Sequence, residues 1–238
     1  MRVFLIFTLT LLSQIYADID NCRIEQSLEK ISVVGQGGDI WLGTAENSTW
    51  EKFGRNVEAT QVTSSGEIWA FSSLGGGKIY YLENSENNYW VNNWQLVQNP
   101  IIQIIPFVPT NIILLSVSSD GNNVAAVATS NKIYVRAGFG TGGGAQWTSI
   151  THNLRKPQTI QVTNSGDLWA TDSHKQLWYL KDGTYWQICK GWSGGANIKT
   201  LSVSSDGSKV AAITLSDEIV IRDGFGTGVA EEWTRIYD

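Results

Sequence analysis

One phrase of this sequence is written twice. LSVSSDG occupies residues 115–121 and returns at residues 201–207, an offset of 201 − 115 = 86 positions. The following residues also match, with VAAVATSNKIYVRAGFGTG after the first copy and VAAITLSDEIVIRDGFGTG after the second. Repetition on this scale indicates a fold built by stacking copies of one small structural unit.

A second repeated phrase interleaves with the first. QVTSSGEIWAF from Gln61 returns as QVTNSGDLWAT from Gln161, an offset of 161 − 61 = 100, and a degenerate copy, ISVVGQGGDIWLG, starts at Ile31. The glycines that end the repeated turns are Gly38, Gly66, Gly121, Gly166 and Gly207. They define five units of about 30 to 55 residues, a period that is typical of propellers and solenoids.

Within a unit, apolar residues recur with period two, which predicts short β-strands. LSV, VAAVAT, KIYVR and QWTSI are four such strands in one unit, and turns such as Ser119-Asp120-Gly121 separate them. After the first residues, only Ile24 to Ile31 weakly resembles a helix. A blade of four strands cannot bury both faces alone, whereas a ring of blades can. We therefore predict an all-β fold, a β-propeller of four-stranded blades, with five blades expected and six as the alternative.

The first residues resemble an export signal. Arg2 supplies a positive start, residues 3–12 form an apolar run, and Ala17 offers a small residue for cleavage. The run is shorter than the roughly 18 residues of a membrane-spanning helix. We expect residues 1–17 to be a signal peptide and residues 18–238 to form a single propeller domain. The protein is expected to be secreted and extracellular, without membrane insertion.

Composition restricts the partners. Charged residues make up 16% of the chain, the formal net charge is −5, and no run of Lys and Arg is evident. Nucleic acid is therefore a poor candidate partner.

Cys22 and Cys189 are the two cysteines, and in an oxidising compartment a disulfide between them is expected, with two separate buried thiols as the alternative. Asn47 begins an N-x-T sequon and is a candidate glycosylation site in a surface loop.

The chain has 11 tryptophans, and most of them recur at fixed places in the units. Trp41, Trp69 and Trp169 each follow a turn glycine by three residues, which predicts one equivalent strand position. Four others open the last strand of a unit: Trp94, Trp147, Trp186 and Trp233. Indole rings bury a large area and their N–H groups need acceptors, so we interpret these seven as packing residues between blades rather than as a sugar-binding stripe.

These residues resemble the tectonin repeat, found in tectonin-repeat β-propeller lectins such as fish egg lectins and the tachylectin-like lectins of horseshoe crabs. The carriers are GEIWAF from Gly66, GDLWAT from Gly166, KIYVRAG with QWTSI, and EIVIRDG with EWTRI. CRIEQSLEKISV from Cys22 is also similar to the opening of fish egg lectins. The resemblance spans nearly the whole mature chain and implies a propeller that binds carbohydrate.

The chain departs from that pattern in two places. After TWEKFG the first unit lacks a Trp-x-x-Ile strand, so an outer strand is expected to be missing or irregular. The apolar insert NPIIQIIPFVPTNII at residues 99–113 contains three of the four prolines, which exclude a regular central strand. It could be an edge strand or a partner surface, but we favour a loop packed on a neighbour.

The resemblance also implies how the ring would close. In such propellers the N-terminal segment commonly supplies a strand to the last blade, so Arg23 to Gln26 would lie against unit five and bring Cys22 toward Cys189. The C-terminal WTRIYD already offers an outer strand for that unit, and the two ends therefore compete for one role.

The sequence contains only weak matches to catalytic and nucleotide-binding motifs. Residues 138–143 satisfy GxGxxG but join two strands, so the helix N-terminus that binds pyrophosphate is not expected. Residues 191–195 satisfy GxSxG, but no His follows Ser193 as a hydrolase would require. His152 and His174 each stand alone in polar loops, and we expect both to be solvated. The sequence therefore predicts a binding protein rather than an enzyme, with no required cofactor.

The resemblance implies glycan ligands, among them bacterial lipopolysaccharide and sugars that contain N-acetylglucosamine. Polar side chains beside an aromatic face suit saccharides. Residues 83–94 have this composition, and the candidate binding residues there are Asn87, Asn88, Tyr89, Trp90 and Asn92. The corresponding loop KDGTYW adds Asp182 and Tyr185, and the GFGTG loops from Gly138 and Gly224 are a second candidate rim. Ordinary Asn-rich turns are the alternative interpretation.

Two further hypotheses stay open. Related lectins can bind calcium, and the Asp and Asn side chains of the loops are suitable oxygen ligands, so a calcium site is a candidate whose residues the sequence does not identify. The rival to a lectin is a protein-binding propeller that uses Ile101, Ile102, Ile104 and Ile105 of the insert as an apolar contact.

Overall fold

The structure is a computed structural model, and it describes residues 23–26, 30–34, 39–44, 51–54, 57, 59–65, 67–72, 78–82, 95–97, 112–137, 147–150, 153–183, 185–189, 198–223 and 233–236. Within these residues, strands β1 to β20 form five antiparallel sheets of four strands each, numbered here as sheets 1 to 5. Each sheet consists of four consecutive strands of the chain in spatial order.

The strand bounds are as follows. Sheet 1 contains β1 (Arg23–Gln26), β2 (Lys30–Val34), β3 (Ile40–Thr44) and β4 (Glu51–Gly54). Sheet 2 contains β5 (Ala59–Val62), β6 (Ile68–Ser72), β7 (Lys78–Leu82) and β8 (Gln95–Val97). Sheet 3 contains β9 (Ile112–Val117), β10 (Asn123–Ala128), β11 (Ile133–Ala137) and β12 (Thr148–Ile150). Sheet 4 contains β13 (Thr159–Val162), β14 (Leu168–Thr171), β15 (Leu177–Lys181) and β16 (Tyr185–Ile188). Sheet 5 contains β17 (Ile198–Val203), β18 (Lys209–Thr214), β19 (Ile219–Asp223) and β20 (Thr234–Arg235).

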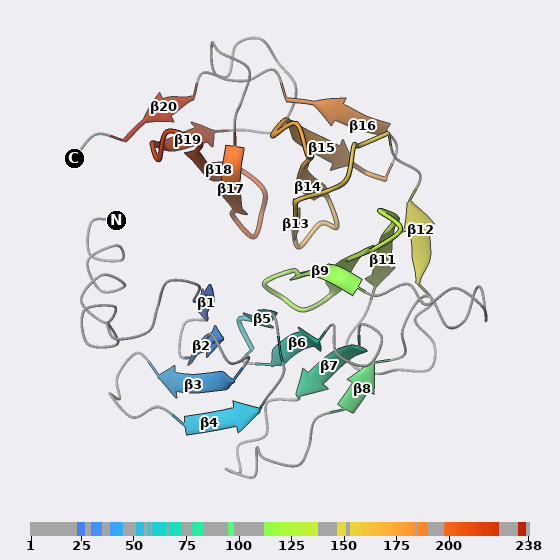
Figure 1. Cartoon of the computed structure of the whole chain (residues 1–238), viewed down its shortest axis with the longest axis vertical. Helices are drawn as coiled ribbons and strands as arrows, with labels where there is room; N and C mark the ends of the chain where they lie inside the picture. Colours follow the sequence, from blue (N-terminus) through green and yellow to red (C-terminus); the bar gives the residue numbers. More distant parts are fainter. Residues whose placement is uncertain are drawn as a thin grey trace.

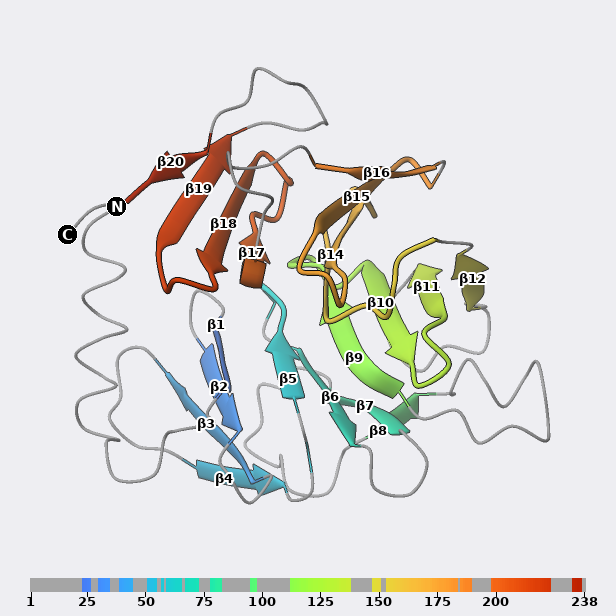
Figure 2. The ribbon, with the colours of Figure 1, turned by 45° about the horizontal axis from the view of Figure 1, so that its top comes forward.

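The sheets are arranged around a common centre. Figure 1 shows the first strand of each sheet nearest the centre and the fourth strand at the periphery. The tilted view in Figure 2 shows the same order, with β4, β8, β12, β16 and β20 outermost. The first strand of each of sheets 2 to 5 contacts the sheet before it. The prediction of an all-β fold made of four-stranded units is confirmed.

Each central sheet is buried on both faces because it has a neighbour on either side. In β6, alternate residues point to opposite faces, yet all five are buried. Trp69 and Phe71 pack with residues of sheet 3, whereas Ile68 and Ala70 pack with residues of sheet 1. Similar apolar clusters fill the junctions between sheets 3 and 4 and between sheets 4 and 5. The core therefore lies in layers between the sheets.

Sheet 1 differs from the prediction because it is displaced by one strand. Arg23–Gln26 forms β1 and pairs with β2, with Arg23 opposite Val34, so the expected placement against unit five and the weak helix at Ile24 to Ile31 are both wrong. Of the two alternatives expected for the outer strand, missing or irregular, the second is confirmed, since Glu51–Gly54 forms β4. Its pairing with β3 is irregular, with a register shift between Ile40 and Trp41. Because sheet 1 has an added inner strand, the repeated Gly-x-x-Trp motif lies on its third strand instead of on its second.

This displacement separates the tryptophans that the sequence made equivalent. Trp69 and Trp169 lie on second strands and are 0% exposed, but Trp41 lies on the third strand of its sheet and is 36% exposed. Lys52 Nζ stands 5.8 Å from the centre of the Trp41 ring, a cation–π distance. The single position predicted for the three residues is therefore wrong for Trp41.

The packing role predicted for the other tryptophans is largely confirmed. Trp147 and Trp233 are buried just before β12 and β20, Trp186 is half-buried, and Trp94 lies outside the described residues. The expectation that every buried indole N–H finds an acceptor is wrong. Among the described residues, Nε1 of four rings has none: Trp69, Trp169, Trp186 and Trp233.

Sheet 5 carries the same apolar face as sheet 3 with less cover. Positions 86 residues apart are equivalent by the repeat, so Ile133 of β11 corresponds to Ile219 of β19. Ile133 is 0% exposed because it packs at the junction with sheet 4, whereas Ile219 is 39% exposed. Ile236, the counterpart of Ile150, is 47% exposed. The junction beyond sheet 5 is therefore more open than its counterpart beyond sheet 3.

Candidate functional site

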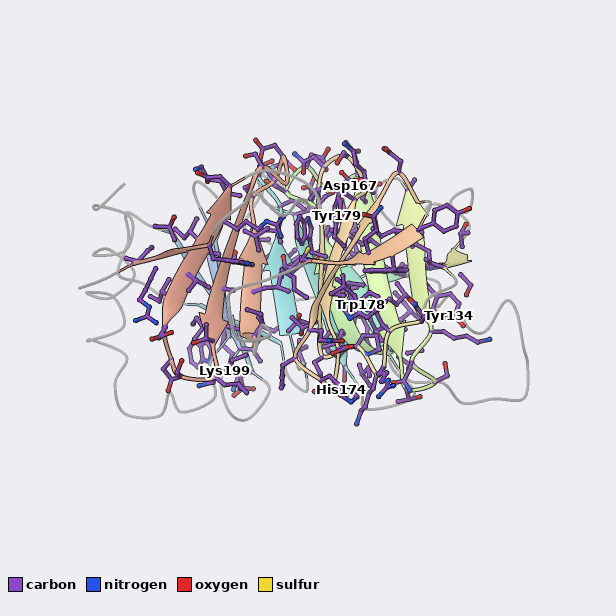
Figure 3. The ribbon with its side chains drawn as sticks, turned by 90° about the horizontal axis from the view of Figure 1, so that it is seen from above. Tyr134, Asp167, His174, Trp178, Tyr179 and Lys199 are labelled. Atoms are coloured by element: carbon purple, nitrogen blue, oxygen red, sulfur yellow. The ribbon has the colours of Figure 1, made fainter. Side chains whose placement is uncertain are left out.

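The antiparallel topology gives each sheet two edges with different connections. Turns between first and second strands and connections between third and fourth strands share one edge, which we call the upper rim. Turns between second and third strands lie at the opposite, lower edge. Figure 3 shows Asp167 and Tyr179 toward the upper rim and His174 and Lys199 at the lower edge.

The loops predicted to bind sugar connect third and fourth strands. β7 ends at Leu82 and β8 begins at Gln95, so residues 83–94 join two strand ends at the upper rim. Residues 83–94 themselves lie outside the described residues, and with them the candidates Asn87, Asn88, Tyr89, Trp90 and Asn92. The GFGTG loops after β11 and β19 lie outside them as well.

Sheet 4 carries the loop whose two candidate residues are described. Asp182 has φ 52°, a left-handed conformation that Asp tolerates better than most side chains. Its backbone N–H donates to Asp167 Oδ1 at 3.0 Å, which ties the connection to the first turn of the same sheet. Tyr185 is 78% exposed on the outer strand β16, opposite Lys181. The structure thus brings Asp182 to Asp167, while Tyr185 presents its ring to solvent.

Asp167 is a rim residue that the sequence analysis did not select. It is buried, and its Oδ2 accepts a hydrogen bond from Ser165 Oγ at 2.9 Å. Burial raises the pKa of Tyr179 above its ordinary value, and the charges of Asp167 and Asp182 raise it further. Glu67 stands at the equivalent position of sheet 2 and accepts hydrogen bonds from Thr63 and Ser65. An acidic residue directly follows three of the five turn glycines, Gly38, Gly66 and Gly166, and this was the available signal.

The repeated SSDG turns form a second set of rim groups. Asp206 is exposed, and hydrogen bonds from Ser204 Oγ and then from Ser208 lower its pKa to about 2. The counterpart Asp120 is partly desolvated, which raises its pKa, but hydrogen bonds from Ser118 and Asn122 outweigh that effect and lower it. Both carboxylates are therefore ionised at neutral pH and present acceptor oxygens at the rim.

Neighbouring turns are hydrogen-bonded to one another along the rim. Ser64 N donates to Ser119 O at 2.6 Å, and its repeat counterpart Asn164 N donates to Ser205 O at 2.8 Å. The junction between sheets 3 and 4 uses side chains instead, because Asp120 N donates to Asn164 Oδ1 and Asn123 Nδ2 donates to Asn164 O. These bonds hold the first turns of sheets 2 to 5 in a fixed row.

Other predicted features stay untested. Cys189 is buried in the cluster between sheets 4 and 5, but Cys22 lies outside the described residues, so the disulfide stays a prediction. Asn47, His152 and the Pro/Ile insert before residue 112 are also outside them. The described part of the chain holds no group of three or more His, Cys, Asp or Glu side chains placed to bind a metal ion. Nor does it hold a helix long and apolar enough to cross a membrane.

Comparison with known proteins gives the fold class. No family model and no curated protein sequence matches the chain. Among solved structures, it is similar to YCF48 bound to D1 peptide, with TM-score 0.58, 13% identity, and coverage of 89% of this chain and 65% of that one. The β-propeller domain of Cps50 (Swd1) from Myceliophteria thermophila gives TM-score 0.58 at 13% identity over 88% of this chain and 72% of that one.

Streptogramin B lyase is also similar, with TM-score 0.55, 14% identity, and coverage of 85% of this chain and 68% of that one. The chain thus spans 65% to 72% of the length of these three structures, and less than two thirds of the YCF48 structure. At such identities the likeness shows the fold alone. The chain has the fold of β-propeller proteins.

Proposed function

We propose that this chain is a secreted, non-catalytic carbohydrate-binding propeller of the tectonin type, which recognises glycans on cell or microbial surfaces through its upper rim. One observation carries the proposal: two kinds of feature lie at the upper rim. They are the repeated polar turns and the strand ends that flank every loop with lectin-like composition. The tectonin-like motifs of the sequence give the ligand class. Bacterial lipopolysaccharide and sugars with N-acetylglucosamine are the candidates to test.

The chemistry of the rim suits neutral sugars. Ionised carboxylates such as Asp206 accept hydrogen bonds from sugar hydroxyls, and exposed Ser and Asn side chains can donate or accept. The exposed ring of Tyr185 offers an apolar face that can cover one side of a pyranose. Since the rim groups recur in sheets 2 to 5, several weak sites on one rigid frame would give avidity for a glycan-coated surface.

We propose that the ring consists of five blades. Support comes from the agreement between five sequence units and five described sheets in the order of the chain. The exposed fractions of Ile219 and Ile236 favour a junction between sheets 5 and 1 that is looser than the other junctions.

The test is a glycan array probed with the mature secreted protein, with and without a chelator. We expect saturable binding that is weakened by Tyr185→Ala and abolished by combined Tyr89→Ala and Trp90→Ala, while the melting temperature is kept. Ile188→Ala is the matched control, because this residue is 43% exposed at the lower end of the same strand as Tyr185. Loss of binding in chelator would add a calcium site to the proposal.

A folded protein that binds no glycan would refute the lectin assignment. That result would favour the alternative, a protein-binding propeller that uses the Pro/Ile insert. Polar substitution of Ile101, Ile102, Ile104 and Ile105 should then abolish binding of the protein partner.

A further inference from the structure

Four basic side chains gather at the lower edge of sheet 4, on the opposite side from the upper rim. We call Arg155, Lys156, His174 and Lys175 the basic patch. The first two belong to the connection between β12 and β13, and the other two belong to the turn between β14 and β15. Ser173 N donates to Arg155 O at 2.8 Å, and Arg155 Nη1 lies 3.2 Å from His174 Nε2. Two segments that are separate in the sequence therefore form one surface.

The patch keeps its positive charge available. Four other basic residues of the described chain pair with carboxylates, in the pairs Lys52–Asp39, Lys199–Asp217, Lys209–Asp223 and Arg235–Glu218. Within the described residues, no carboxylate forms an ion pair with Arg155, Lys156 or Lys175.

The carboxylate of Asp172 stands closest in the chain, but it serves the turn itself. It is buried and accepts hydrogen bonds from His174 N at 2.8 Å, Gln176 N at 3.1 Å and Trp178 Nε1 at 3.0 Å. Its oxygens thus hold the backbone and an indole rather than a basic side chain. The carboxylate of Asp172 is thus occupied within the turn, while His174 is exposed and Lys175 is half-buried at the surface.

The repeat shows that Lys175 is an unusual residue for its position. The turns between second and third strands are built alike in sheets 3, 4 and 5, with Asn131 N donating to Ala128 O, Lys175 N to Asp172 O, and Asp217 N to Thr214 O. All three residues have left-handed backbones, with φ of 63°, 61° and 61°. Asn and Asp tolerate this conformation best among residues with a side chain, and Lys does not share the advantage.

Lys156 has a left-handed backbone as well, with φ 47°. Two lysines of one small patch therefore occupy conformations that their type disfavours. Strain of this kind is retained where a side chain is needed for function, so the observation points to a use for the charge.

We propose that the basic patch binds a sulfate or phosphate ester carried on a polysaccharide. A guanidinium can hold such a tetrahedral oxyanion with two hydrogen bonds, and neighbouring ammonium groups add charge. The patch is one connection and one turn wide, so it fits one or two ester groups. The formal net charge of −5 disfavours a long uniform polyanion such as nucleic acid and favours charges spaced along a sugar chain. This site is independent of the upper rim and does not rest on the proposed lectin activity there.

The experiment is titration calorimetry of the mature protein at 0.05 M salt with three tetrasaccharides: a sulfated heparin fragment, its desulfated form, and a phosphorylated mannan fragment. Binding of either ester with no binding of the desulfated form supports the proposal. The tighter of the two identifies the ester. Binding of neither ester, or equal binding of the desulfated fragment, overturns it.

Substitutions separate charge recognition from folding. Arg155→Gln and Lys175→Asn should each weaken ester binding at least about tenfold, the loss expected when a charge-assisted hydrogen bond is removed. Lys175→Asn should also leave the melting temperature equal to or above that of the parent, because Asn suits the left-handed turn. Lys209→Gln, at the upper rim, is the control and should bind normally. Unchanged binding in both patch variants would overturn the assignment.

Discussion

Replacing Ile133 and Ile219 in turn by Ala should produce unequal losses of stability, although the two residues are repeat counterparts. Ile133 is 0% exposed, and truncation of a fully buried Ile to Ala costs about 2 to 5 kcal/mol through lost burial and the cavity left behind. Ile219 is 39% exposed, so a smaller area is lost and solvent can fill the space. We expect the cost at Ile219 to be about 1 to 2 kcal/mol, following the exposed fraction.

Urea unfolding, monitored by tryptophan fluorescence, gives both free energies, and the slopes should match between the variants because each exposes the same chain on unfolding. Val127→Ala and Ile213→Ala form a second pair, one fully buried and one half-buried, with the same expected order. Equal losses of stability at Ile133 and Ile219 would refute the reasoning. They would mean that the face of sheet 5 that carries Ile219 is as well covered as the face of sheet 3 that packs on sheet 4.

Two other predictions follow from buried polar groups. Trp178→Phe should cost about 1 to 3 kcal/mol more unfolding free energy than Trp169→Phe. Trp178 Nε1 donates to buried Asp172, so its loss leaves that carboxylate short of a donor, whereas Trp169 Nε1 has no acceptor among the described residues. Equal urea midpoints for the two variants would contradict this. The raised pKa of Tyr179 means that above pH ~10 the folded state holds a proton that the unfolded state releases, so this contribution to stability is present below that pH and is lost as pH rises. Tyr179→Phe should therefore flatten the fall in unfolding free energy between about pH 9.5 and 11, and an unchanged slope there would contradict the assigned shift.

The sequence predicted the repeating unit well because the unit is local. Strand alternation and turn glycines are set by residues within a few positions of each other, and the strands around LSVSSDG occur where the pattern puts them. The displacement of sheet 1 could not be predicted in this way. It depends on whether Arg23–Gln26 pairs with β2 or elsewhere, and that choice is decided by tertiary contacts that a repeat alignment does not contain.

The candidate sites show the same division. Asp182 was found from its loop composition, but its link to Asp167 depends on two turns that meet only in the folded sheet. The basic patch was missed for a related reason. Arg155 and His174 are 19 residues apart, so no short window of the sequence contains this cluster. The sequence argument against nucleic acid used the net charge and the absence of Lys and Arg runs, and neither reveals basic residues that meet only in the fold.

The composition of each sheet from four consecutive strands has a consequence for how the chain folds. No strand among the described residues waits for the opposite end of the chain, so each sheet can form once its own stretch of about 40 residues has emerged during synthesis. Apart from the junction between sheets 5 and 1, each sheet has to find only the sheet just before it, which keeps the loop-closure costs of those steps low. Sheet 5, which emerges last, would then dock on four sheets already in place.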